Sequence, residues 1–232
     1  MINIGTTDFY LAVPSLPREE FELYSTSLFD EWEVYAAKIL GLSDYSLFLN
    51  VEEGSISAKG KVAATVGALY LGIAQYGSFV SGVKALNEQI HTVGGYLSDK
   101  AYVPFKSSNI KPRIRKSGGA LTRLETLFVK VRNGEITVEE AMKTSERILG
   151  PEIYDEPEFI NSLQSSLEST PSQTHFPFED IEQPITLRGG NDKERNPKQT
   201  KPSQPIIRPD QYRVEVWRES KRGKKNVRVI KL

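Results

Sequence analysis

Apolar residues recur along this chain with two periods, and the changes of period predict its elements. Residues 6–13 favour a short strand that Pro14 closes. Pro17 then opens a helix that ends at Gly41, because apolar residues within it recur at spacings of three and four and form one stripe. This stripe consists of Phe21, Tyr24, Leu28, Trp32, Tyr35 and Ile39.

A strand pair and a second helix follow. Residues 45–52 and 55–60 predict two strands joined by a turn, so together they form a hairpin. After a long uncharged segment, residues 84–97 predict a helix that stops at Gly94-Gly95. With a helical region in the uncharged segment, the predicted order is strand, helix, strand pair, helix, helix.

The uncharged segment, residues 62–83, admits three interpretations. It has the length of a membrane-spanning helix, which needs roughly 20 apolar residues, and its glycines would then let helices approach closely. It could instead be the buried centre of a soluble fold, or a membrane element that a soluble oligomer buries until a trigger releases it. The glycines concerned are Gly67, Gly72, Gly77 and Gly82.

We favour the buried centre. A glycine at every fifth residue does not keep to one face of a helix, because five residues advance the chain about 500° around the axis. The spacing suits two shorter helices with a break near residues 75–77. In this interpretation Tyr70, Tyr76 and Phe79 pack against the helix that carries Trp32.

Residues 119–150 predict a helical hairpin. The first helix ends at Gly134, Thr137 and Glu140 predict a capping box for the second, and Gly150 ends it. The stretch GEITVEE resembles the GxIT-x-EE helical hairpins that are appended to many bacterial proteins. This resemblance implies a role in assembly.

The C-terminal part predicts a tethered β-hairpin. Residues 151–205 are poor in aliphatic side chains and rich in proline, serine and charge, which predicts a flexible linker. Residues 211–218 and 226–231 alternate as two strands, and a lone hairpin is marginal in water. We therefore expect the hairpin to pair with the main sheet, or with another chain by strand addition. The residues expected to contact a partner are Tyr212, Val214, Val216, Trp217, Val227 and Val229.

The predicted fold class is α+β. A mixed N-terminal domain with a glycine-rich central helical region precedes a helical hairpin, a flexible linker and a C-terminal β-hairpin. The expected boundaries are 1–103 for the N-terminal domain, 104–118 for a basic connector, 119–150 for the helical hairpin, 151–205 for the linker and 206–232 for the C-terminal hairpin.

Charge is balanced over the whole chain, with 30 basic and 30 acidic residues, but it is unevenly distributed. Residues 1–60 carry a net charge of −7, whereas 106–132 carry +7 and 206–232 carry +6. This segregation fits head-to-tail assembly, or a surface that faces an anionic partner such as nucleic acid. The residues that would contact phosphates or another anionic surface are Arg113, Arg115, Lys116, Lys221, Arg222, Lys224 and Lys225, with Tyr212 and Trp217 able to stack on bases.

Motifs for catalysis or cofactor binding do not stand out. The chain has no cysteine, and its two histidines, His91 and His175, have no ligand-spaced partner, so we expect no metal site and no cofactor. A cysteine-free composition and an N-terminus without a secretory signal fit a cytoplasmic protein, with membrane association as the alternative. We expect a non-catalytic accessory subunit that binds a protein partner or its own copies through the two hairpins. The alternatives are a membrane-acting effector that uses residues 62–83 and a nucleic-acid-binding accessory protein.

Overall fold

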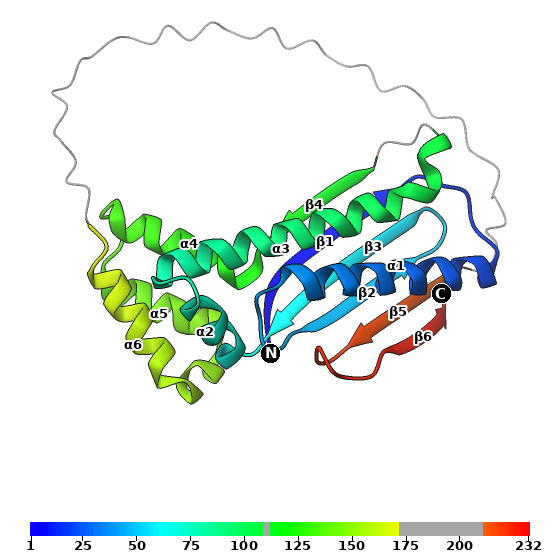
Figure 1. The fold of residues 1–232 in the computed structure, drawn as a ribbon. Helices are drawn as coiled ribbons and strands as arrows, with labels where there is room; N and C mark the ends of the chain where they lie inside the picture. The colour runs from blue at the N-terminus through cyan, green and yellow to red at the C-terminus, as the bar shows by residue number, and fades with distance from the viewer. Residues whose placement is uncertain (109–111, 172–210) are drawn as a thin grey trace, which may run out of the picture.

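The computed structural model, which describes residues 1–108, 112–171 and 211–232, has an antiparallel sheet and a layer of helices (Figure 1). The strands are β1 (Ile2–Leu11), β2 (Ser46–Glu52), β3 (Ile56–Ala64), β4 (Arg113–Ser117), β5 (Tyr212–Arg218) and β6 (Asn226–Lys231). They form one sheet in the order β4-β1-β3-β2-β5-β6, and every neighbouring pair is antiparallel. The expected α+β fold class is confirmed.

The first four strands have a regular connectivity. Helix α1 (Arg18–Ile39) links β1 to β2, whereas α2 (Val66–Ala74) and α3 (Phe79–Tyr102) link β3 to β4. Each of these connections skips one strand, and β2 and β3 form a hairpin. This is the split β-α-β connectivity of ferredoxin-like sheets. The C-terminal hairpin β5–β6 then adds two strands beside β2.

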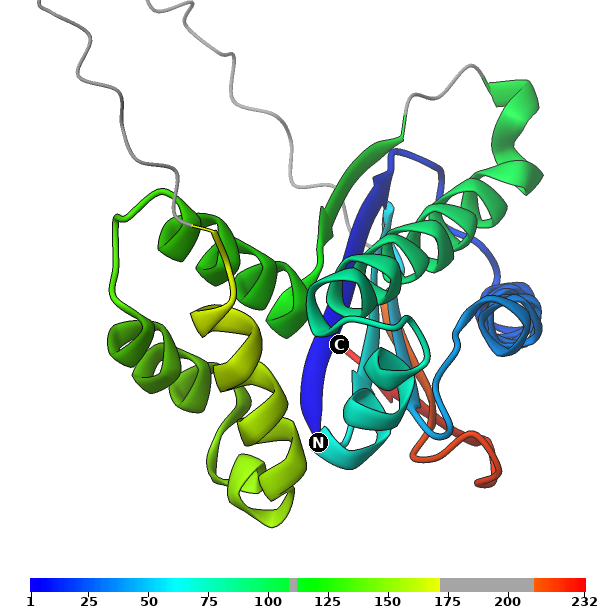
Figure 2. The ribbon, with the colours of Figure 1, turned by 60° about the vertical axis from the view of Figure 1, so that its left-hand side comes forward.

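Helices α1 and α3 pack together on one face of the sheet (Figures 1 and 2). Trp32 of α1 is fully buried, and its Nε1–H donates to the carbonyl oxygen of Val93 in α3 at 3.1 Å. Its ring and Leu97 lie over Gly60 of β3, where a Cβ would collide with Leu97 and lie 3.4 Å from Trp32. Because Gly60 has no side chain, both helices can approach the sheet closely.

The uncharged segment 62–83 is not one helix. It finishes β3, forms α2, turns and begins α3, and the two helices are bent by 109°. The hydroxyls of Thr65 and Ser78 cap them, accepting hydrogen bonds from the N–H groups of Ala68 and Ser81 at 3.2 Å each. Among the described residues no single helix is long and apolar enough to cross a membrane, although this bent pair together has that length and composition.

The four glycines of this segment have separate local roles. Gly72 and Gly82 are buried where helices meet, Gly67 faces Glu156, and Gly77 adopts a φ of 73° in the turn between the helices. A residue with a side chain would be strained at Gly77. The glycines therefore do not form one common face.

The aromatic residues of the segment pack elsewhere than expected. The ring centroids of Tyr70 and Phe79 lie 6.4 and 5.2 Å from that of Phe159, and Phe79 also lies 6.0 Å from Phe128. The hydroxyl of Tyr76 accepts a hydrogen bond from α3. The prediction that Tyr70 and Phe79 pack against α1 is wrong, because the segment turns toward the C-terminal helices, whereas the Tyr76 hydroxyl lies near Gly41, just past the end of α1.

Helix α3 continues through Gly94-Gly95 to Tyr102, past its predicted end. A Cβ at Gly94 would collide with the hydroxyl of Thr7 and lie 3.4 Å from its Cβ. The glycine pair therefore marks a close approach of α3 to β1, and not a helix terminus.

The helical hairpin is confirmed as α4 (Gly119–Arg132) and α5 (Val138–Leu149). Thr137 and Glu140 form the expected capping box. The apolar faces of both helices join the common hydrophobic core. In Figure 1 the hairpin lies beyond the end of the sheet at which β1 begins.

The prediction of a linker from residue 151 onward is wrong for its first part. Residues Pro151–Asp155 form a 3₁₀ helix and Pro157–Glu168 form α6, and residues 172–205 lie outside the described part of the chain. Phe159, Leu163 and Leu167 recur every four residues and are buried against the other helices. Polar residues surround these three positions, so the helical period is difficult to recognise in the sequence.

The basic connector predicted over 104–118 is also partly wrong. Residues Val103–Ser108 form a 3₁₀ helix, and Arg113–Ser117 form β4, which pairs with β1 at one edge of the sheet. All five residues of β4 are exposed, so no apolar alternation indicates a strand there.

We predict opposite effects for two glycine-to-alanine changes in α3. A Cβ at Gly82 would collide with the carbonyl oxygen of Ile73 and lie 2.8 Å from its Cα, and this backbone cannot turn aside. We therefore expect Gly82→Ala to lower the free energy of unfolding by about 1–3 kcal/mol, which is typical of overpacking. The control is Gly95→Ala, whose Cβ would meet only the flexible end of Lys116.

Gly95→Ala should raise the free energy of unfolding by about 0.5–1 kcal/mol, because alanine favours a helix interior. Urea denaturation of both variants measures these changes. Equal stabilisation by the two substitutions would contradict the close contact between α2 and α3.

Candidate functional site

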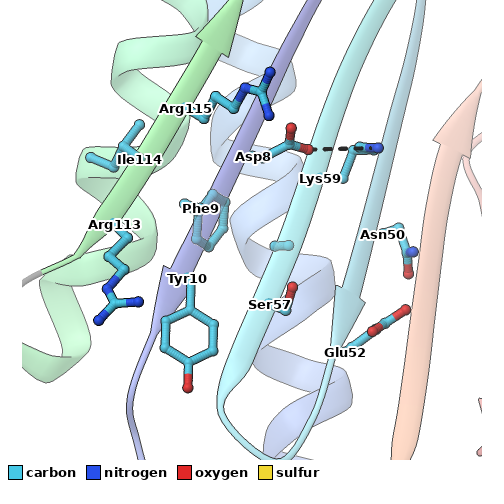
Figure 3. A pocket seen from close by; sticks show the side chains of 11 residues that line it. Asp8, Phe9, Tyr10, Asn50, Glu52, Ser57, Lys59, Arg113, Ile114 and Arg115 are labelled. Atoms are coloured by element: carbon cyan, nitrogen blue, oxygen red, sulfur yellow. Dashed lines mark ion pairs between the residues drawn. The ribbon is translucent and has the colours of Figure 1, made fainter. Parts of the chain in front are cut away.

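Within residues 1–108, 112–171 and 211–232, no helix covers the face of the sheet that points away from α1 and α3. Burial alternates along β1: Phe9 and Leu11 on the helix side are 3% and 0% exposed, whereas Tyr10 between them is 40% exposed. The same alternation runs through β2 and β5. Figure 3 looks onto this face, with helices behind the strands.

Strand register arranges the outward residues in three rows across the sheet, which we call the open face. The first row is Ser117, Thr6, Lys61, Phe48, Trp217 and Asn226; the second is Arg115, Asp8, Lys59, Asn50, Glu215 and Arg228; the third is Arg113, Tyr10, Ser57, Glu52, Arg213 and Ile230. None of these residues is buried, and basic residues outnumber acidic ones two to one.

Two of the three acidic residues on the open face are paired with a cation beside them. Asp8 Oδ1 lies 3.8 Å from Lys59 Nζ, and Glu52 Oε1 lies 2.6 Å from the guanidinium of Arg213. Glu215, in the second row, has no hydrogen bond or ion pair within the described residues. The negative charge of this face is therefore largely offset by its own cations.

Four cations of the open face are in contrast unpaired. Within the described residues they make no hydrogen bond and no ion pair; they are Lys61, Arg113, Arg115 and Arg228. They leave a local excess of positive charge on a chain whose formal net charge is zero.

A hollow of about 420 Å³ lies at the β4 side of the open face (Figure 3). Arg113 and Arg115 reach it from β4, and Asp8 projects between Arg115 and Lys59. Asn50 lines its far side, and the side-chain oxygen of this residue has no hydrogen-bond partner within the described residues. Positive groups thus border this hollow on two sides.

A second hollow, of about 390 Å³, lies over β2 and β5 on the same face. Phe48, Lys61 and Trp217 line it. Phe48 and Trp217 are direct partners in the register of β2 and β5, so their Cβ atoms are about 5 Å apart. Two half-exposed rings and a free ammonium group therefore lie side by side.

The C-terminal hairpin belongs to the sheet of its own chain, because β5 pairs with β2. Of the residues expected to contact a partner, Val214 and Val216 are fully buried in the core, Tyr212, Val227 and Val229 lie on the helix side, and Trp217 lies on the open face. The buried valines are therefore not available to another chain in this arrangement.

The basic residues expected to contact one anionic partner lie on different parts of the molecule. Arg113 and Arg115 are on the open face, whereas Lys116, which follows Arg115, points to the helix side, where its Nζ lies near Gly95. Those of the β5–β6 turn lie at the opposite edge of the sheet; they are Lys221, Arg222, Lys224 and Lys225. Of these, Lys225 pairs with Asp30 of α1 at 2.6 Å.

Several residues of the open face were not among those expected from the sequence. They are Tyr10, Phe48, Lys59, Lys61, Arg213 and Arg228. The signal that could have found them is the alternation within each strand, since the outward positions are the ones that alternate with the buried ones. Which outward residues become neighbours depends on the strand order.

Neither a metal site among the described residues nor a similarity to a known protein indicates the function. Within the part of the chain that the structure describes, no three His, Asp or Glu residues gather as a metal site would require. No protein-family model, curated protein or solved structure matches the chain. The chemistry of the open face is therefore the basis for a functional proposal.

The hairpin is attached to α1 by a charge pair that is partly shielded from water. Arg218 Nε lies 2.7 Å from Glu33 Oε1, and both side chains are mostly covered. The Nε–H is not directed at a hydrogen-bond acceptor, so the pair is a charge contact and not a well-aligned hydrogen bond. Burial raises the pKa of the Glu33 carboxyl, and the nearby Arg218 lowers it by less.

This pKa predicts a pH dependence of stability. As pH rises above about 4.3, the usual pKa of glutamate, the unfolded chain loses the Glu33 proton before the folded chain does. Ionisation of Glu33 therefore lowers the free energy of unfolding in this window, while Glu33→Gln has no such titration. We expect the stability of the wild type relative to Glu33→Gln to fall between about pH 4 and pH 6.

Urea denaturation of both proteins across this pH range measures the difference. Because Arg218 stays charged throughout, the slope reports Glu33 together with its coupling to the neighbouring Asp30. A difference that rises with pH would contradict the dominance of burial at this carboxyl.

Proposed function

We propose that this chain is a non-catalytic binding protein that holds a polyanionic partner on the open face of its sheet. The observation that carries the proposal is the set of four cations on this face that have no partner in the described part of the chain, beside acids that are themselves mostly paired. Surface cations that have no counter-charge in their own protein are available to an anionic partner.

The shape of the face supports an extended partner. Two hollows of about 420 and 390 Å³ lie at its two sides, and both are bordered by basic residues. Single small-molecule sites are usually more enclosed than these two hollows. A chain with repeated negative charges can contact both hollows at once.

The sequence predicts partner binding by the two hairpins, and we propose the open face instead. Most apolar side chains of α4 are buried within this chain, and so are Ala141 and Leu149 of α5 and Val214 and Val216 of β5. The hairpin β5–β6 instead contributes Arg213, Trp217 and Arg228 to the open face. We retain the cytoplasm as the proposed location.

Two neighbouring residues of β4 test this proposal. Arg115 points to the open face and Lys116 to the helix side, so Arg115→Gln and Lys116→Gln remove one charge each from opposite faces of one strand. We expect the full chain to be retained on a heparin column, and Arg115→Gln to elute at lower salt, because each lost anion contact weakens the ionic term. Lys116→Gln should elute close to the wild type.

Because the formal net charge is zero, retention at neutral pH reports a local basic surface and not a general excess of positive charge. Equal shifts for the two variants, or no retention of the wild type, would refute the assignment to the open face.

A further inference from the structure

We infer that the polyanion is a single-stranded nucleic acid, whose phosphates contact the cations near β4 and β3 and whose bases stack on Phe48 and Trp217. This inference rests on the function proposed above and adds the chemical class of the partner. It starts from the first row of the open face, in which Lys61, Phe48 and Trp217 are consecutive neighbours on β3, β2 and β5.

The two rings in this row lie on the side of the sheet away from the hydrophobic core. Phe48 and Trp217 are only half-buried and line a hollow on the side away from the core. The other tryptophan, Trp32 of α1, is buried against α3 and the sheet. Half-exposed aromatic rings beside a cation are a typical platform for unpaired bases, because every base has a face that can stack.

The charges of the open face indicate a diagonal path. Arg113 and Arg115 begin it on β4, Lys59 and Lys61 continue it on β3, and the aromatic pair ends it on β2 and β5. Strand spacing of ~4.8 Å and a rise of ~3.4 Å per residue give this path a length of about 24 Å. That length suits ~4 nucleotides, at the lower end of the site sizes of small single-strand-binding folds.

The acidic residues of the open face restrict the path. Glu52 and Glu215 lie on β2 and β5 in the third and second rows, away from the diagonal. Asp8 lies beside it but is paired with Lys59. Phosphates that follow the diagonal therefore meet cations and avoid the two acids on the opposite side.

The open face is better suited to a single strand than to a duplex. Reading a duplex requires a helix or a β-ribbon that enters a groove, and the bases of a duplex have no free face to stack. The open face is instead the flat side of a sheet whose rings are accessible. RNA-binding domains use open sheet faces in this way, with bases on aromatic side chains.

The experiment uses the full chain with 12-mers of deoxythymidine, uridine and a DNA duplex, and with heparin as a polyanion without bases. Fluorescence anisotropy of labelled oligonucleotides gives each Kd, and quenching of tryptophan emission reports stacking on Trp217. The variants are Trp217→Leu, Phe48→Leu and Arg115→Gln, with Tyr154→Leu as the control. Tyr154 is 60% exposed and belongs to the 3₁₀ helix before α6. This 3₁₀ helix packs on α5 of the helical hairpin, away from the open face.

We expect the single strands to bind more tightly than the duplex, and the comparison of uridine with deoxythymidine to show whether the 2′-hydroxyl contributes. Trp217→Leu should raise the Kd for single strands roughly tenfold and abolish the quenching, while heparin binding stays unchanged. Arg115→Gln should weaken the binding of single strands and of heparin, and it should reduce the slope of log Kd against log salt concentration by about one. Tyr154→Leu should change neither. Urea denaturation of each variant shows whether the fold is retained.

Other outcomes separate this inference from the proposed function. Duplex binding as tight as single-strand binding, or an unchanged Kd for Trp217→Leu, overturns the inference, and the proposed function stands if Arg115→Gln still lowers heparin retention. A dimer in sedimentation that Trp217→Leu dissociates assigns the face to a second copy and overturns the inference. Failure to bind any polyanion overturns both.

Discussion

The close packing of α1 and α3 on one face of the sheet is the constraint on which the rest of the structure depends. Trp32 and Leu97 lie over Gly60, and Gly94 lies against Thr7, so the helices approach the strands at positions without side chains. The buried apolar residues of the central strands, such as Phe9, Leu49 and Val51, then point to this face. Among the described residues no apolar layer covers the opposite face, which can therefore carry charged and aromatic residues at no cost to the core.

Elements with strong local patterns could be predicted from the sequence, because their periodicity and capping signals are contained within a few residues. The stripe of α1, the hairpin β2–β3 and the capping box of α5 are of this kind. The prediction failed where tertiary contacts supply the reason for a structure. The pair Gly94-Gly95 predicts a helix end, but it lies inside α3, where Gly94 lets the helix approach Thr7 of β1 closely. Strand β4 has no buried residue, so only its pairing with β1 makes it a strand.

The open face could be predicted only in part for a related reason. Alternation within a strand shows which side chains share a face, and it groups Arg113 with Arg115, or Lys59 with Lys61. It does not show that these two pairs lie on either side of Asp8, because that depends on the strand order β4-β1-β3. Grouping basic residues by sequence segment joined Arg115 with Lys116, which the pleat of β4 directs to opposite faces.

The C-terminal hairpin contributes side chains both to the core and to the open face. Without it, β2 would be an edge strand, and Leu49 and Val51 would lose the valines of β5 beside them. The same strand that supplies these valines supplies Arg213 and Trp217 on its other side, because successive side chains of a strand alternate between faces. The ion pairs of Arg218 with Glu33 and of Lys225 with Asp30 attach the hairpin to α1. A change that loosened the hairpin would therefore remove half of the aromatic pair together with part of the core, so stability and binding are coupled through β5.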